Sequence, residues 1–255
     1  MKALRWVVGT IGEVLITLGL LLLLFVAWQL WWTDVAANRE QAVTVQTLER
    51  GFGHDDAYPT DPLATPTPDP SATPTPDPLA TLTPDPLATL KKVPFGEAFA
   101  ILRIPRFGAS FARPVLQGTD HPTLGKGVGH YVGTTMPGLV GNFATAGHRT
   151  TYGRPFNNID KLQKGDVIVV ETKVSYVVYA VARHVIVTPD HVEVIAPVPQ
   201  RPGVAPTEAW MTMTACNPKY SASQRYVVFA KLVKIIPRAD GLPASFMAVP
   251  AGAVG

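Results

Sequence analysis

The chain has 255 residues, one cysteine and a formal net charge of +3. This length allows one or two domains, and a single cysteine excludes an intramolecular disulfide. The charge is uneven: residues 93–237 hold 15 basic and 8 acidic residues, whereas residues 33–92 are acidic. The basic residues are scattered and form no recognition motif, so we expect no nucleic-acid partner. A domain working beside anionic lipid or wall polymer accounts for the same charge.

The first 32 residues predict a membrane anchor. Residues 14–32 are almost wholly apolar and long enough to cross a hydrocarbon core of ~30 Å. Four of the five tryptophans flank this run, as at the two interfaces of a bilayer. Lys2 and Arg5 precede it, so the positive-inside rule predicts a cytoplasmic N-terminus and an extracellular remainder. We expect residues 6–32 to be retained as a single-pass anchor in the cell membrane. A signal peptide cleaved near residues 35–37 is the alternative, but the apolar run exceeds the usual ~7–15 residues.

A proline-rich repeat follows. From Asp61 the dipeptide Asp-Pro recurs every eight residues, at positions 61, 69, 77 and 85. Proline fixes φ and removes a backbone donor, so an extended polyproline II chain without a packed core is expected. We predict that residues 33–92 form a disordered extracellular stalk, in which roughly 30 repeat residues reach ~90 Å. A repeat that itself binds a partner is the alternative, which this composition disfavours.

Residues 93–237 predict an all-β domain. Period-2 alternation marks strands at residues 99–105, 141–148, 166–187 (two strands around a turn), 209–216 and 225–236. Helical periodicity is weak, and short helical turns are expected near residues 122–126 and 155–162. Several strands at this spacing are typical of a closed barrel or a sandwich. Residues 238–255 are expected to form a flexible tail.

The cysteine lies at the end of a predicted strand. The sequence TMTAC puts Thr214 and Cys216 on one face, and Arg225 begins the next strand. If these strands are neighbours, Cys216 and Arg225 face each other, and a nearby cation makes a thiol a better nucleophile. His148, after another strand, is the candidate acid or base, and His130 is a weaker candidate. A buried structural cysteine and a structural histidine are the plainer alternatives.

Three motifs in order, TAGHRTTYG, TMTACNP and QRYVVFA, resemble those of sortases: a His after a strand, a T-x-T-C strand end and an Arg on the following strand. The resemblance spans most of residues 93–237. The stretch GHYVGTTMPGLVGNFATAGHRTTYGRPF looks most like the class E sortases of high-GC Gram-positive bacteria. Met213 and Ala215 stand where the family often has Leu and Thr. The Asp-Pro steps precede Leu or Ser, unlike the Asp-Pro-aromatic lid of class C pilin polymerases.

The resemblance implies a closed eight-stranded β-barrel with one or two short helices. It also implies transpeptidation of secreted proteins at a C-terminal sorting signal of the LAxTG or LPxTG kind, cleaved between Thr and Gly. Cys216 then forms a thioacyl-enzyme, His148 acts as general acid and base, and Arg225 binds the substrate backbone or the oxyanion. The implied acceptor is an amine of a peptidoglycan precursor. Because the thioester keeps the bond energy, no ATP, metal or other cofactor is expected.

Further residues are predicted to bind the signal. Thr214 points to the same groove as the nucleophile, and Tyr131 is expected to contact the residue after the leucine, with a core tyrosine as the alternative. The stretch 188–210 holds five prolines and is longer than a hairpin needs. The resemblance implies that it forms a wall of the groove. We predict that three of its residues line an apolar pocket for the leucine: Val192, Val194 and Ile195. The alternative is that these three pin the loop to the barrel.

Two other functions remain open. A non-catalytic wall-binding or adhesive domain on a membrane stalk would leave Cys216 merely buried. An L,D-transpeptidase also attaches to peptidoglycan, but that family's Ser-x-Gly-Cys motif is not found in TACNP.

Overall fold

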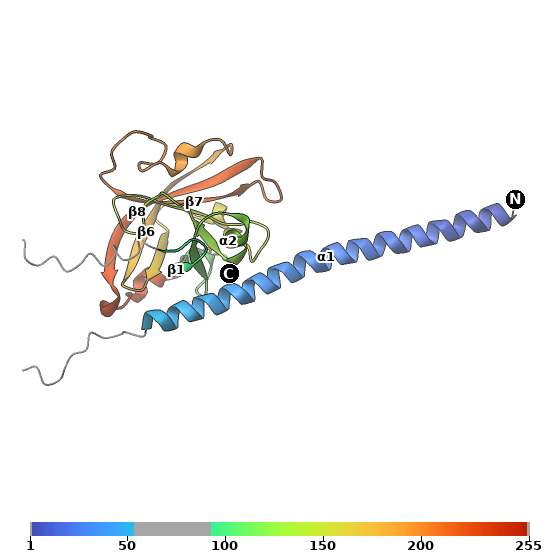
Figure 1. Ribbon diagram of the computed structural model, residues 1–255, viewed down its shortest axis with the longest axis horizontal. Helices are drawn as coiled ribbons and strands as arrows, with labels where there is room; N and C mark the ends of the chain where they lie inside the picture. The colour runs from blue at the N-terminus through green and yellow to red at the C-terminus, as the bar shows by residue number, and fades with distance from the viewer. Residues whose placement is uncertain (1, 54–92, 254–255) are drawn as a thin grey trace, which may run out of the picture.

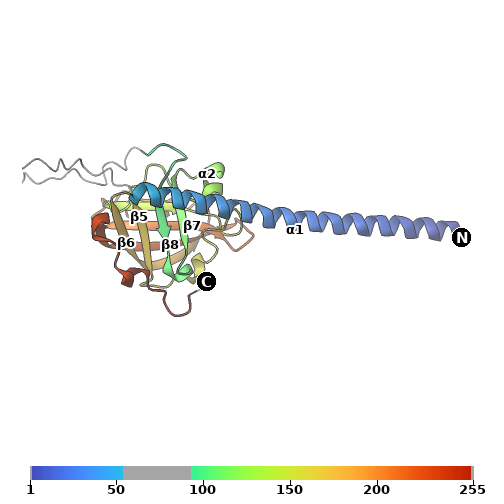
Figure 2. The same cartoon turned by 90° about the horizontal axis from the view of Figure 1, so that it is seen from below.

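The computed structural model describes residues 2–53 and 93–253. It consists of a closed β-barrel and one long helix, α1 (Lys2–Gly53), that runs along the barrel and then leaves it (Figures 1 and 2). Both views show the C-terminal part of α1 against the barrel and the N-terminal part extending away. The Asp-Pro repeat that was predicted to be a stalk lies outside the described residues.

The N-terminal part of α1 is long and apolar enough to cross a membrane, by length and composition. Its described apolar side chains are exposed, and at its barrel end the rings of Trp28 and Trp32 stack at 6.2 Å. A helix that exposes apolar side chains on every side is suited to lipid rather than to water. The finding supports the predicted anchor over residues 6–32.

The helix continues well beyond the predicted anchor. Residues 33–53 are helical, so the prediction of a disordered stalk is wrong for this segment. Small, apolar or amide side chains recur every three or four residues and are buried or partly buried against the barrel: Ala37, Gln41, Val45, Leu48 and Phe52. Val45 and Phe52 form a cluster with Ile101. This spacing keeps one face of a helix against the barrel, which explains why the segment folds as a helix.

Polar contacts from α1 hold a loop of the barrel. Asp34 forms an ion pair with Arg154 at 2.9 Å and accepts a hydrogen bond from the backbone N–H of Gly153 at 3.2 Å. Gln41 Nε2 donates to the carbonyl of Tyr152 at 2.9 Å. Tyr152 and Arg154 have φ values of 52° and 48°, a left-handed conformation that costs non-glycine residues about 1–2 kcal/mol each. The helix therefore stabilises a strained loop.

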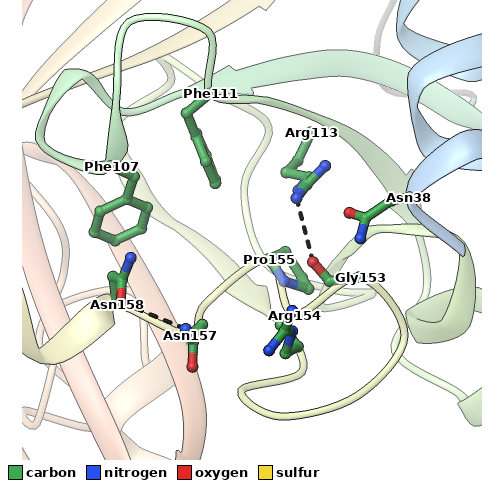
Figure 3. A pocket seen from close by; sticks show the side chains of 9 residues that line it. All are labelled: Asn38, Phe107, Phe111, Arg113, Gly153, Arg154, Pro155, Asn157 and Asn158. Carbon is green, nitrogen blue, oxygen red and sulfur yellow. Dashed lines mark hydrogen bonds between the residues drawn. The ribbon is translucent and has the colours of Figure 1, made fainter. Parts of the chain in front are cut away.

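A small cavity of about 220 Å³ remains between helix and barrel. Figure 3 shows Asn38 of the helix beside Arg113 and Gly153, and Arg113 Nη2 donates to the Gly153 carbonyl at 3.2 Å. Toward the other end of the docked segment, Glu49 forms an ion pair with Arg103. The docked part of α1 is thus held at both ends.

Eight strands close the barrel in the order β1-β2-β3-β4-β7-β8-β6-β5. The strands are β1 (Ala98–Arg103), β2 (Ala112–Gln117), β3 (Val128–His130), β4 (Gly141–Ala146), β5 (Val167–Thr172), β6 (Ser175–Val187), β7 (Ala209–Asn217) and β8 (Gln224–Pro237). The pairs β2–β3 and β4–β7 are parallel, and the other neighbouring pairs are antiparallel. The predicted eight-stranded barrel is confirmed.

Alternation along the strands separates an inner face from an outer one. On β7, Met211, Met213 and Ala215 belong to the core cluster inside the barrel. Successive side chains on a strand point to opposite faces, so Thr214 and Cys216 point outward. The barrel interior is closed by apolar packing, and the cysteine lies outside it.

Short helices occur where the sequence predicted them. The helix α2 (His121–Lys126) is capped by the preceding Asp120, whose side chain accepts a hydrogen bond from the Thr123 N–H at 3.3 Å. Such a cap satisfies one of the backbone donors that a helix start leaves free. The second predicted helical segment contains the 3-10 turn η3 (Ile159–Lys161). Further 3-10 turns are η2 (Pro105–Phe107), η4 (Val192–Ile195), η5 (Arg238–Asp240) and η6 (Ala244–Met247).

The prediction of a flexible C-terminal tail is wrong for the described residues up to 253. Leu242, Phe246 and Met247 pack against a cluster on the outer face of β5, β6 and β8: Val169, Val178 and Ile236. The carbonyl of Ala251 accepts a hydrogen bond from Arg106 at 2.9 Å. Apolar side chains at positions 242, 246 and 247 thus attach the tail to the barrel.

Candidate active site

The end of β7 places Cys216 at the outer rim of the barrel. Its side chain is half-buried, and the antiparallel register sets Cys216 opposite Arg225 on β8. The two strands are neighbours, as the sequence interpretation required. The thiol and the guanidinium therefore belong to one edge of the sheet.

The strand β4 brings His148 to the same edge. β4 and β7 run parallel, with Ala146 opposite Thr214, so both strands end at one edge of the barrel. His148 follows Ala146 by two residues, as Cys216 follows Thr214. Gly147 lies between, and a Cβ there would meet the ring of Phe156 at 2.7 Å. The small residue lets the chain turn closely over that ring.

A cavity of about 260 Å³ opens at this edge. It is lined by Thr119, Leu124, Tyr131, Ala146, Gly147, His148, Thr214, Ala215, Cys216 and Arg225. The structure thus brings together the three predicted catalytic residues and two of the predicted substrate-binding residues. These five come from strands β7 and β8 and from the loops after β3 and β4.

The surroundings of His148 disfavour its charged form and leave one nitrogen unpaired. Burial lowers the pKa of His148 below its ordinary value, and the nearby charge of His121 lowers it further. The ring packs on Tyr152, with 5.0 Å between the centroids. Its Nε2 is buried and has no hydrogen-bond partner within residues 2–53 and 93–253. A buried nitrogen without a partner is costly to keep, and such an atom is suited to proton exchange with a bound substrate.

Arg225 is fixed by the turn that precedes it. Its Nη1 donates to the carbonyls of Ala222 at 2.9 Å and of Gln224 at 3.0 Å. These bonds hold the guanidinium at the rim of the cavity. A fixed cation stabilises a developing negative charge with little reorganisation.

Tyr131 and Thr214 form a pair beside the thiol. The phenol oxygen lies 3.0 Å from Thr214 Oγ1, and Thr214 Oγ1 donates to the carbonyl of Thr145 at 3.2 Å. Both side chains line the cavity, so Tyr131 is not a core tyrosine. The pair ties the loop after β3 to β7, the strand that carries Cys216.

Comparison with known proteins identifies the family. The family model for the sortase domain matches residues 102–233, more than half of the chain. The chain belongs to the sortase family. Sortases are cysteine transpeptidases, and a reactive thiol beside a histidine and an arginine is the arrangement that such chemistry needs.

Sortase SrtE1 of Streptomyces coelicolor is 34% identical over 91% of this chain and 59% of its own length. The chain thus spans about three fifths of that relative. Sortase SrtE2 of the same organism is 32% identical over 89% of this chain and 82% of its own length.

Solved sortase structures share the barrel. Sortase E from Streptomyces avermitilis superposes with a TM-score of 0.55 and 39% identity, over 60% of this chain and 99% of that chain. Sortase E1 from Streptomyces coelicolor, solved with a tripeptide in the active site, gives a TM-score of 0.53 and 39% identity over 58% and 95%. The resemblance of this sortase to the class E members is therefore confirmed.

The three residues predicted to line the leucine pocket differ in their surroundings. Val194 is buried with Val227 and Phe229 on the outer face of the sheet, and Ile195 packs against the same cluster. Val192 is 71% exposed, and none of the three residues lines the cavity beside Cys216. The prediction is wrong for Val194, whose side chain is covered by the barrel itself. The contacts of Val194 and Ile195 pin the loop, as the alternative held.

His130, the weaker histidine candidate, does not reach the cavity. It lies on β3, buried, and its Nδ1 is 2.7 Å from Gln117 Oε1. Its Nε2 is 2.9 Å from Thr134 Oγ1. These contacts make it a structural histidine of this sortase.

Arg149 is the residue that the sequence analysis missed. It is 5% exposed, and its Nη1 donates to Asn217 Oδ1 at 2.6 Å and to the carbonyl of Cys216 at 3.4 Å. Its Nη2 pairs with Asp160 at 3.1 Å. Arg149 thus joins the loop after His148 to the end of β7. The sequence signal that could have identified Arg149 was its position directly after His148.

Metal chemistry has no obvious ligands here. Within the part of the chain that the structure describes, no group of three or more His, Cys, Asp or Glu residues could hold a metal ion.

Proposed function

We propose that this sortase cleaves a C-terminal sorting signal of the LAxTG or LPxTG kind between Thr and Gly, and joins the secreted protein to an amine of a peptidoglycan precursor. The observation that carries the proposal is the single cavity shared by His148, Cys216 and Arg225 in a chain of this family. The partners are therefore secreted proteins that bear the signal, and the acceptor amine.

In the first step, the thiol proton of Cys216 passes to His148, and the sulfur attacks the carbonyl carbon of the signal's threonine. Negative charge develops on the carbonyl oxygen, and the Arg225 guanidinium, held at the cavity rim, donates hydrogen bonds to it or to the adjacent backbone. His148 gives a proton to the glycine nitrogen, the C–N bond breaks, and a thioester remains on Cys216. The buried, unpaired Nε2 of His148 supports this role.

In the second step, an amine attacks the thioester carbon. His148 takes the proton from the attacking nitrogen, the C–S bond breaks, and His148 passes that proton to the sulfur, which restores the thiol of Cys216. The new amide replaces the one that was cleaved, so the exchange needs no external energy source. Water in place of the amine would give simple hydrolysis.

The signal would lie along the outer face beside β7. Tyr131 and Thr214 border the thiol, and we propose that Tyr131 contacts the residue between leucine and the variable position. The tripeptide in the active site of the Streptomyces coelicolor relative supports peptide binding at the corresponding cavity. The Ala-or-Pro preference would then depend on the space beside the phenol ring.

The proposed topology is a single-pass one. Residues 6–32 span the cell membrane, with Lys2 and Arg5 on the cytoplasmic side and the barrel outside. The candidate span in α1 supports the anchor, and the charge bias supports the orientation. Secreted substrates would then meet the enzyme on the outer side.

The test is to trap the acyl-enzyme. Incubation with a LAxTG peptide should add the mass of the N-terminal peptide fragment to Cys216, and triglycine amine should release it as the longer amide. Cys216→Ala should abolish cleavage while leaving the melting temperature near that of the wild type, because only a rim thiol is lost. Thr119→Ala, at the same cavity but without a chemical role, is the matched control and should retain activity. Undiminished turnover in Cys216→Ala would refute the mechanism, and an inert wild type would favour a non-catalytic wall-binding domain.

A further inference from the structure

The barrel begins where the membrane-spanning stretch ends. Trp31 and Trp32 close the apolar part of α1, and the first ion pair between helix and barrel, Asp34 with Arg154, follows two residues after Trp32. A helix rises 1.5 Å per residue, so the loop that holds Arg154 lies about 3 Å farther along the axis than Trp32. The helix is continuous through this point. No spacer separates the span from the barrel.

The loops beside the span are those of the active site. A cavity of about 570 Å³ is lined by Trp31 of the helix, by residues of the loop that follows His148, and by Tyr220 of the β7–β8 turn. That turn begins directly after the strand that carries Cys216. Figure 1 shows the β7–β8 turn at the end of the barrel toward which α1 leaves for its N-terminus. The active-site end of the barrel therefore faces the membrane.

The other end of the barrel lies far from the bilayer. Phe52 follows Trp32 by 20 residues, which is about 30 Å along the helix. The guanidinium of Arg238 lies 5.0 Å from the ring centre of Phe52, and its Nη1 donates to the carbonyl of Thr172 at 3.0 Å. The β5–β6 turn, with the exposed Lys173, thus marks the end away from the membrane.

We propose that the barrel end that carries Cys216 rests on the outer headgroup layer of the bilayer, with Tyr220 as its main contact. Tyr220 is 91% exposed, and a ring with a polar tip is suited to the membrane interface. The exposed Lys219 and Lys126 on the same side add positive charge, which anionic headgroups attract. The inference rests on the proposed topology, in which α1 spans the membrane and the barrel lies outside. It means that signal and acceptor are joined at the lipid surface, not at the end of a long stalk.

The lone cysteine makes a direct test possible. In a Cys216→Ala background, Tyr220→Cys and Lys173→Cys each give the full-length protein a single thiol for an environment-sensitive fluorophore. The labelled proteins are reconstituted into phosphatidylcholine–phosphatidylglycerol vesicles that contain a lipid with a nitroxide on its headgroup. The label at position 220 should lose most of its emission. The emission of the label at position 173 should be the same as in control vesicles without the nitroxide lipid. Equal quenching at both positions, or none at position 220, overturns the proposal. A label at 220 that lipid does not quench but that is shielded from iodide would show that protein covers this surface instead.

A second variant separates the span from the barrel. A flexible Gly-Ser linker inserted between Trp32 and Thr33 leaves the contacts of Asp34 and Gln41 with the barrel in place. Quenching at position 220 should then fall to the level seen at position 173. In the form that keeps Cys216, the same insertion should leave cleavage of a short soluble peptide unchanged. Quenching that persists after the insertion would show that the helix does not set the orientation, which also contradicts the proposal. Failure of peptide cleavage in the wild type would refute the function, while the quenching result stands independently because it is measured without the thiol.

Discussion

The strands β3 and β4 are antiparallel neighbours; His130 lies on β3 and His148 just beyond β4, yet the surroundings of the two rings differ. His130 is 1% exposed, and its two ring nitrogens lie 2.7 Å from Gln117 Oε1 and 2.9 Å from Thr134 Oγ1. Burial lowers the pKa of His130 to about 4, so the ring is neutral at ordinary pH. Burial also lowers the pKa of His148, but its Nε2 has no hydrogen-bond partner in the described residues, and the ring lines the cavity of Cys216.

A lowered pKa therefore does not distinguish the histidine proposed to be catalytic from the structural one in this barrel. Burial disfavours the charged ring in both places. The difference is in the hydrogen bonds: those of His130 are all made within the fold, whereas Nε2 of His148 is left for a substrate. Leaving a buried polar atom unpaired costs about 1–3 kcal/mol, which a purely structural role would not explain.

The largest expected effect comes from removing each ring in turn. His148→Ala should lower kcat/KM by roughly 10²–10⁴-fold, because no other group is placed to protonate the leaving amine. Its unfolding free energy should change little. His130→Ala should instead destabilise the barrel by about 3 kcal/mol, since it opens a cavity and leaves Gln117 unpaired. Peptide cleavage per folded molecule should stay within a few-fold of the wild type.

Peptide kinetics and urea unfolding measure both variants, with the activity corrected for the folded fraction. A His148→Ala enzyme that keeps near-normal activity would remove the general-acid role from this residue. A folded His130→Ala enzyme that has lost its activity would place His130 in the mechanism, despite its contacts.

The second test concerns the neighbour that positions the site. Arg149 joins the His148 loop to Asn217 and to the Cys216 carbonyl, so Arg149→Met should let these two loops drift apart. Small misplacements of reacting groups are costly, and kcat should fall roughly 10–100-fold with a smaller change in KM. Arg149→Lys should recover part of kcat, since it restores the charge beside Asp160 but not the planar fork.

The matched control is Arg183→Met. Arg149 lies 5.6 Å from the ring centre of Tyr226, and Arg183 similarly lies 4.1 Å from that of Phe229. Arg183 hydrogen-bonds to Gln200 and does not line the cavity. Its kinetics should match the wild type. If Arg149→Met lowers the melting temperature without changing kcat, Arg149 supports the fold alone. The functional difference between the surroundings of His130 and those of His148 would then lie in the two histidines and not in Arg149.

Sequence alone predicted much of the barrel. Alternation marked β1 and β4 to β8, because each has at least six residues with one apolar face. It missed β2, whose sequence ARPVLQ contains a charge and a proline, and β3, which has three residues. Their places depend on pairing with partners distant in sequence, which a single-strand pattern does not contain.

The helix beyond the anchor was missed for a different reason. The prediction extended the stalk from the proline repeat to the whole segment beginning at residue 33. Residues 37, 41, 45, 48 and 52 nevertheless recur every three or four positions, the spacing of one helix face. At the site, motif spacing located the residues of the cavity, since strand ends fix them. The loop residue Val194 was misassigned because a loop's course over the barrel follows tertiary contacts and not local pattern.

The smallest expected effect separates the two causes that lower the pKa of His148. Burial is the larger cause, and a surface substitution leaves it in place. The second cause is the charge of His121, whose ring centre lies 6.1 Å from that of His148. In His121→Gln the like charge is gone, so the pKa of His148 should rise while burial still keeps it below its ordinary value. In the proposed mechanism the protonated ring is the acid. The limb of kcat/KM that falls with rising pH should therefore move to higher pH.

A pH–rate profile and an NMR titration of the His148 ring measure this shift. His191→Gln is the control, because His191 pairs with Glu193 in the β6–β7 loop and away from the cavity. High salt should shrink the shift, since it screens charges exposed to solvent. A limb that does not move, or that moves to lower pH, would show that His121 does not act on His148 through charge. A shift that survives high salt would point to the lost ring contact instead, and burial alone would then account for the lowered pKa of His148, as it does for His130.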